Sequence, residues 1–118
     1  MNTYRIYHFK DHTKELLAYY PNLKNLLFGI KPMNNYYYKQ IETFFYLNDD
    51  INDYFKNYFK DREGYENKLN IHTLYNQLTK ESISAHVYDY YIEIEANNKK
   101  NIFYEILYQK SENYAIID

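Results

Sequence analysis

The sequence predicts a single α+β domain over residues 1–118, with helices packed on a small mixed sheet of about four strands. Three observations predict it. Residues alternate with period two near both ends of the chain, helical periodicity fills much of the middle, and no Pro-, Gly- or Ser-rich linker divides the sequence. The expected order is one strand, three or four helices, two strands, one helix and one strand.

The N-terminal part predicts a strand followed by helices. Residues 4–9 alternate with β-branched and aromatic side chains, which is typical of a strand. Apolar residues then recur at helical spacing over 16–30, where Pro21 predicts either a kink or the start of a second helix. Residues 31–35 have the composition of a loop, and the apolar positions of 37–47 mark one face of a further helix.

The middle of the chain carries the clearest helical pattern. Apolar residues of 51–59 fall at i, i+3, i+4, i+7 and i+8, which predicts an amphipathic helix that ends near Gly64. Residues 65–79 suit either a helix or an extended segment. Because Ile71, Leu74, Tyr75 and Leu78 recur at helical spacing, we expect a helix there.

The C-terminal part predicts a hairpin, a helix and a strand. Alternation over 83–87 and 92–96, on either side of Asp89-Tyr90, predicts two antiparallel strands with a tight turn. Residues 102–107 carry another helical stripe, and 114–117 read as a short closing strand.

Composition excludes several classes of protein. The chain has no cysteine, which excludes disulfides and thiolate sites and fits a reducing compartment. Its N-terminus shows no basic region followed by a long apolar stretch, and its apolar runs are too short to span a bilayer, so we expect a cytoplasmic protein that does not enter membranes. The net charge is −2 with interleaved signs, which predicts no direct nucleic-acid binding.

The residue pattern predicts neither an enzyme nor a cofactor site. The two glycines lie far apart, so no glycine-rich loop can cradle a phosphate. His8 and His12 have the spacing of helical metal ligands, but they fall on an expected strand and an expected loop, so we expect no metal. Glu93 and Glu95 share a strand face, where a solvated surface is the more ordinary explanation than an acid–base pair.

Tyrosine is the conspicuous residue, with 18 copies alongside 7 phenylalanines. Part of this excess reflects the Asn-, Lys-, Ile- and Tyr-rich bias of an AT-rich genome. Helical spacing predicts that Tyr54, Tyr58 and Tyr75 lie in the core. Adjacent tyrosines around Tyr19 and Tyr36 cannot all point inward. Exposed tyrosine is a favoured anchor in protein interfaces, so the sequence predicts a protein-binding surface on the first helices.

The sequence resembles the sporulation inhibitor of replication family (SirA). The similarity lies in the order and spacing of segments along nearly the whole chain: 4–10, 19–20 followed by 26–28, the Lys-Gln-Ile segment 39–41, 91–96 and 102–107. The resemblance implies a non-enzymatic inhibitor that binds the N-terminal domain of the replication initiator DnaA and blocks its assembly at the origin.

The resemblance also implies contact residues on the first helix and on the helix that carries the Lys-Gln-Ile segment. Tyr19 takes an aromatic contact position and Gln40 a glutamine contact position. A first-helix aromatic position falls near Leu16, and a second-helix aromatic position falls on Thr43, with Phe44 beside it. Both positions depart from the family pattern.

Two other functions fit the sequence. The chain could be a phage or mobile-element inhibitor of a different host enzyme, since such proteins are also small, cysteine-free and AT-biased. A small enzyme would need a pocket lined by Glu93, Glu95 or a histidine, and the sequence predicts none. The oligomeric state does not follow from the sequence.

Overall fold

The computed structural model describes residues 2–19 and 43–117. These residues form a six-stranded sheet in the order β2-β3-β4-β5-β1-β6, in which each neighbouring pair is antiparallel. The strands are β1 (Asn2–His8), β2 (Tyr65–Lys68), β3 (Ile71–Asn76), β4 (Glu81–Val87), β5 (Tyr91–Ala96) and β6 (Tyr114–Ile117). The described helices are α1 (Asp11–Tyr19), α4 (Ile51–Phe59) and α5 (Ile102–Lys110).

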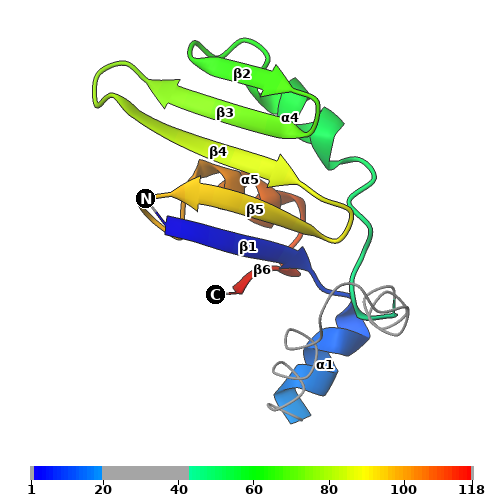
Figure 1. Ribbon diagram of the computed structural model, residues 1–118. Coiled ribbons are helices and arrows are strands. Elements are labelled where there is room, and N and C mark those ends of the chain that lie inside the picture. The colour runs from blue at the N-terminus through cyan, green and yellow to red at the C-terminus, as the bar shows by residue number, and fades with distance from the viewer. Residues whose placement is uncertain (1, 20–42, 118) are drawn as a thin grey trace.

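Helices α4 and α5 lie on one face of the sheet, behind the strands in Figure 1. Every second residue of β1, β4 and β5 points toward these helices, so that Ile6, Ala85, Ile92 and Ile94 are almost completely buried. The helices contribute large apolar side chains to the same core. These are Ile51, Phe55, Phe59, Phe103, Ile106 and Leu107.

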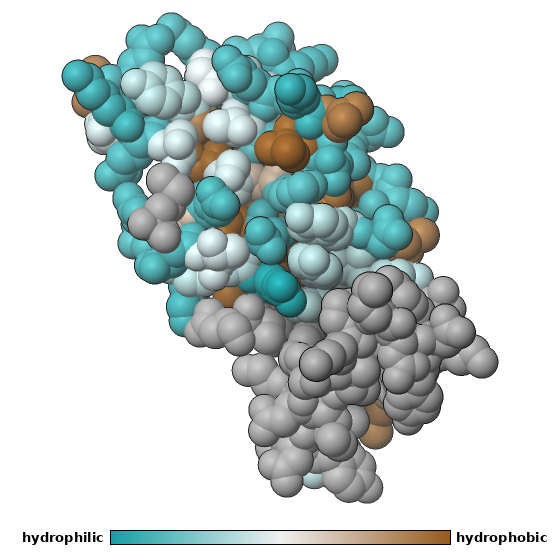
Figure 2. Space-filling view, in the orientation of Figure 1, coloured by the Kyte–Doolittle hydropathy of each residue, from teal (hydrophilic) through white to brown (hydrophobic). Residues whose placement is uncertain are grey.

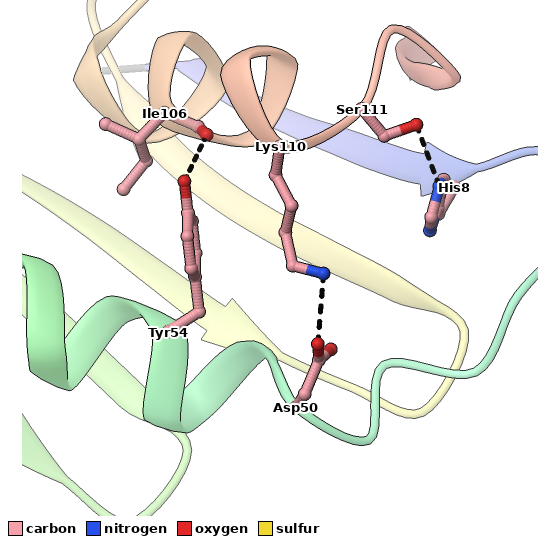
Figure 3. A network of polar contacts seen from close by, with 6 residues as sticks. All are labelled: His8, Asp50, Tyr54, Ile106, Lys110 and Ser111. Atoms are coloured by element: carbon pink, nitrogen blue, oxygen red, sulfur yellow. Dashed lines mark hydrogen bonds and ion pairs between the residues drawn. The ribbon is translucent and has the colours of Figure 1, made fainter.

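Polar contacts fix the two helices to each other (Figure 3). The Tyr54 hydroxyl of α4 donates to the carbonyl oxygen of Ile106 in α5 at 2.7 Å. Lys110 at the end of α5 lies 3.0 Å from Asp50, which immediately precedes α4. The N-terminus of α5 is capped by Asn101, whose side chain accepts from two backbone amides of the first turn.

Seven elements agree with the sequence prediction. The strands at 2–8, 81–87, 91–96 and 114–117 and the helices at 11–19, 51–59 and 102–110 are confirmed, together with the turn at Asp89-Tyr90. The amphipathic pattern that predicted α4 correctly identifies its three fully buried residues, Ile51, Phe55 and Phe59.

The predicted sheet of about four mixed strands is wrong, because residues 65–79 form the hairpin β2–β3 and not a helix. Only His72 and Leu74 of β3 point into the core, while Ile71 and Tyr75 are exposed on the other face. The inward residue at the centre of the alternation is therefore a histidine, which hid the strand pattern among polar residues. Ile71 and Tyr75 have helical spacing in the sequence, but neither of them is buried.

Backbone positions with positive φ also favour the hairpin over a helix. Gly64 has φ +85°, and a Cβ there would collide with the carbonyl oxygen of Tyr75. Gly64 in turn accepts a hydrogen bond from the Tyr75 amide at 2.9 Å. Leu69, at the turn between β2 and β3, has φ 56°. Left-handed positions of this kind end helices and close hairpins.

The predicted helix over 37–47 is wrong at its C-terminal end. Thr43 and Phe44 are helical, but Phe45 pairs with Phe9 in an isolated antiparallel bridge, and the chain then continues without helical structure to residue 50. Residues 37–42 lie outside the described residues, as do residues 20–30 of the predicted helical stretch after Tyr19 and the loop 31–35. Among the described residues, α1, α4, β2 and β3 lie between β1 and the β4–β5 hairpin, so two strands stand where the last of the expected helices was predicted.

Candidate functional site

The six predicted contact residues are only partly described. Tyr36 and Gln40 lie outside the described residues. Leu16 and Tyr19 lie on α1, and Thr43 and Phe44 lie on the short helical segment before the Phe45 bridge. Leu16 is half-buried, Phe44 is half-buried and Thr43 is exposed.

Helix α1 extends beyond the end of the sheet at which β1 finishes (Figure 1). Its start is held by hydrogen bonds to residues 43–46, which lie more than thirty positions later in the chain. The carbonyl oxygen of Phe44 accepts from the Lys10 amide at 3.1 Å and from the Thr13 hydroxyl at 2.6 Å. His12 donates through Nε2–H to the carbonyl oxygen of Thr43 at 3.0 Å.

The same connection continues on the strand side of α1. The Tyr46 amide donates to the carbonyl oxygen of His8 at 2.8 Å, next to the bridge between Phe9 and Phe45. We call this set of backbone and side-chain hydrogen bonds between residues 8–13 and 43–46 the clasp. Thr13 is its most enclosed member, with a fully buried side chain.

An aromatic cluster packs beside the clasp. Tyr7, Phe9 and Phe45 are buried together, with ring centroids 4.9 Å apart for Tyr7 and Phe45 and 5.1 Å apart for Phe9 and Phe45. Phe44 packs against this cluster, and its ring centroid lies 6.1 Å from that of His12. Aromatic packing and the clasp therefore hold α1 and the segment 43–46 as neighbours.

Tyr19 is the most exposed described tyrosine on the candidate surface, with 81% of its surface accessible. It lies at the described end of α1, away from the clasp. The sequence prediction that Tyr19 can be exposed is confirmed. The expectation that Tyr58 and Tyr75 belong to the core is wrong, because they are 50% and 46% exposed, whereas Tyr54 is partly buried against α5.

Sequence reasoning missed Tyr46 and Leu47. Both are exposed, at 41% and 49%, directly after the predicted contacts Thr43 and Phe44. The helical interpretation of 37–47 treated this run as one face of a helix and gave these two residues no role. The sequence held no local signal for this change, because the bridge that ends the helical structure pairs Phe45 with Phe9, 36 positions earlier.

The glutamates considered for acid–base chemistry lie on the open face of the sheet. Glu93 Oε2 is 4.0 Å from Arg5 Nε, and the Arg5 guanidinium lies 5.0 Å from the centroid of the Tyr91 ring. Glu95 is exposed two residues further along β5. Over the described sheet this face is mostly hydrophilic, with small and separated apolar patches (Figure 2). The geometry is that of a solvated sheet face.

The histidines have ordinary structural partners. Burial and the nearby Lys110 hold the pKa of His8 below its usual value. His72 is fully buried, and burial together with Lys56 lowers its pKa to about 4. Within the described ranges 2–19 and 43–117, no three His, Cys, Asp or Glu side chains gather closely enough to hold a metal ion.

The hollow in the described surface with a volume of about 430 Å³ lies far from α1, between the end of α4, the β3–β4 turn and the start of α5. Leu74, Ile83 and Ile102 contribute apolar surface, and Arg62, Glu63 and Glu81 contribute charges of both signs. None of the predicted contact residues lines it.

No helix in the described part of the chain combines the length and the apolar character needed to cross a membrane. No known family model matches the sequence, and no characterised protein matches it either.

Proposed function

We propose that this chain is a non-enzymatic inhibitor of replication initiation that binds the N-terminal domain of DnaA through α1 and the adjoining segment 43–44. The partner comes from the resemblance to the sporulation inhibitor of replication family, and the choice of surface is supported by contacts within the structure. The docking surface is defined here as Leu16, Tyr19, Thr43 and Phe44, together with Tyr36 and Gln40 outside the described residues.

The observation that carries the proposal is the clasp. The resemblance assigns partner contacts to two segments that are separated by more than twenty residues in the sequence. The Phe44 carbonyl oxygen accepts from both Lys10 and Thr13, so the described parts of these two segments are neighbours. Adjacent segments can contact one partner together through an interface of ordinary size.

The exposure of Tyr19 is the second support. A tyrosine that leaves most of its ring in solvent contributes little to the core, yet it can bury a large rigid area and one hydroxyl when a partner arrives. Tyr19 has this character at the described end of α1.

The test is a calorimetric titration of the purified chain with the isolated N-terminal domain of DnaA from the source organism. We expect saturable 1:1 binding, and we expect Tyr19→Ala to weaken it by about 1–2 kcal/mol, which is the usual cost of removing an aromatic anchor. Tyr108→Ala is the matched control, because Tyr108 is 52% exposed on α5 and lies outside the docking surface.

The titration separates the candidate functions. Absence of binding at tens of micromolar of the wild-type chain would reject DnaA as the partner and leave inhibition of another host protein as the next hypothesis. Equal losses for Tyr19→Ala and Tyr108→Ala would reject α1 as the docking element. A change in the origin-to-terminus ratio of chromosomal DNA when the chain is expressed would connect binding to replication initiation.

A further inference from the structure

Tyr46 lies beside the proposed docking surface but is not among its predicted contacts. It follows Phe44 by two positions and is 41% exposed, and its neighbour Leu47 is 49% exposed. The Tyr46 backbone is fixed, because its amide donates to the His8 carbonyl oxygen within the clasp. An exposed tyrosine on a fixed backbone is suited to contact a partner.

The Tyr46 ring rests on an ordered support. Its centroid is 4.6 Å from the centroid of the His8 ring, which stacks at 4.0 Å and 14° on the buried ring of Tyr114. His8 is further fixed by Nε2, which lies 3.2 Å from the Ser111 hydroxyl (Figure 3). The Lys10 ammonium lies 5.8 Å from the Tyr46 centroid. These contacts restrict the ring before any partner binds, which lowers the entropic cost of binding.

Tyr46 and Tyr19 lie near the two described ends of α1. Tyr46 lies at the start of α1, through its contacts with His8 and Lys10, and Tyr19 lies at the described end of the same helix. Eight residues of helix correspond to roughly 12 Å along its axis. A protein interface of ordinary size covers about 800 Å² on each partner and therefore spans such a distance easily.

We propose that Tyr46 is a second aromatic anchor of the docking surface. The inference rests on the proposed function, because it assigns Tyr46 to the same partner as Tyr19. The chemistry of the Tyr46 side chain specifies the surface of the partner that it contacts. That surface has an apolar recess that accepts the ring and a polar group within reach of the hydroxyl.

The test compares four variants in the titration with the DnaA N-terminal domain. We expect Tyr46→Ala to raise the dissociation constant about tenfold or more, as Tyr19→Ala does, and Tyr46→Phe to raise it less because the ring remains. Tyr75→Ala is the matched control, since Tyr75 is 46% exposed on β3 and lies away from the clasp. Thermal unfolding of each variant confirms that the titration temperature lies below its melting range.

The outcomes distinguish this inference from the proposed function. If wild-type chain binds and Tyr19→Ala weakens binding while Tyr46→Ala behaves as Tyr75→Ala does, the second anchor is rejected and the function stands. If the wild-type chain does not bind, both are rejected. A tenfold loss for Tyr46→Ala with an unchanged constant for Tyr75→Ala supports the second anchor.

Discussion

Helices α4 and α1 are attached to the same sheet by different means. α4 buries Ile51, Phe55 and Phe59 completely in the main core. α1 buries the side chain of Thr13, which hydrogen-bonds to a backbone carbonyl, and leaves Tyr19 exposed. Both helices have nine described residues.

The comparison separates the part of the molecule that supplies stability from the part that presents side chains. Burial of large apolar side chains contributes most of the free energy that holds α4 on the sheet, since each such side chain stabilises the fold by about 1.5–3 kcal/mol. A hydrogen bond contributes about 0.5–1.5 kcal/mol net. Among the described contacts of α1, hydrogen bonds to residues 43 and 44 hold its start, while Tyr19 stays available to a partner.

The largest effect is expected in α4. Phe55→Ala removes a fully buried ring whose centroid lies 5.2 Å from that of Phe103 and 5.1 Å from that of His72. We expect a loss of about 3–5 kcal/mol in the free energy of unfolding, measured by urea denaturation. Tyr58→Ala on the same helix is the control, because Tyr58 is half exposed. Similar losses for the two variants would contradict the assignment of α4 to the core.

The second effect concerns the contact between α4 and the β2–β3 hairpin. Asn52 of α4 lies 2.9 Å from Nε2 of buried His72, and the Tyr65 hydroxyl lies 2.8 Å from Nδ1. Asn52 Oδ1 accepts from Nε2–H and Nδ1 accepts from Tyr65, an arrangement that requires neutral imidazole. Burial lowers the pKa of His72 from 6.5 in the free side chain to about 4.

The pH dependence of the unfolding free energy follows from the lowered pKa of His72. Between pH 6.5 and 4 the unfolded chain binds a proton at His72 that the folded chain does not, so stability is complete above pH 6.5 and falls as the pH decreases. We expect a loss of roughly 3 kcal/mol from this group by pH 4. His8, whose pKa is also lowered, acts in the same direction. His72→Gln should flatten the profile of unfolding free energy against pH, and an unchanged slope would contradict the role of His72.

The sequence predicts α4 well because its apolar residues repeat over a full helix. The same reasoning fails at β3, where the central inward residue is His72 and its polar partners Asn52, Tyr65 and Asn67 belong to other segments. Because these partners lie on α4 and β2, the burial of His72 has no signature within β3 itself. The two additional strands join the six-stranded sheet through the pairing of β2 with β3 and of β3 with β4.

The sequence predicts one part of the candidate surface and misses another. The exposure of Tyr19 follows from its position off the apolar stripe of the first helix, and the structure confirms it. The role of Tyr46 does not follow, because helical spacing and extended alternation give different orientations for one short run. The pairing of Phe45 with Phe9 decides between them, and that pairing joins residues 36 positions apart.

A smaller effect is expected at the clasp. Thr13→Val keeps the shape of the buried side chain but removes the hydroxyl that donates to Phe44. The Phe44 carbonyl still accepts from the Lys10 amide, so we expect a loss of about 1 kcal/mol, seen as faster hydrogen exchange of α1 amides. Thr13→Ser, which retains the hydroxyl, should exchange more slowly than Thr13→Val. Equal exchange in both variants would show that the methyl group, and not the hydrogen bond, holds α1.

The smallest effect on stability is expected at Tyr19, where the proposed effect on binding is largest. Because 81% of its surface is already in solvent, Tyr19→Ala should change the free energy of unfolding by less than about 0.5 kcal/mol. Urea denaturation measures this, beside the titration of the same variant. A stability loss comparable to that of Phe55→Ala would place Tyr19 in a core and remove the contrast between α1 and α4. A negligible loss together with weakened binding would show that α1 uses this residue for recognition.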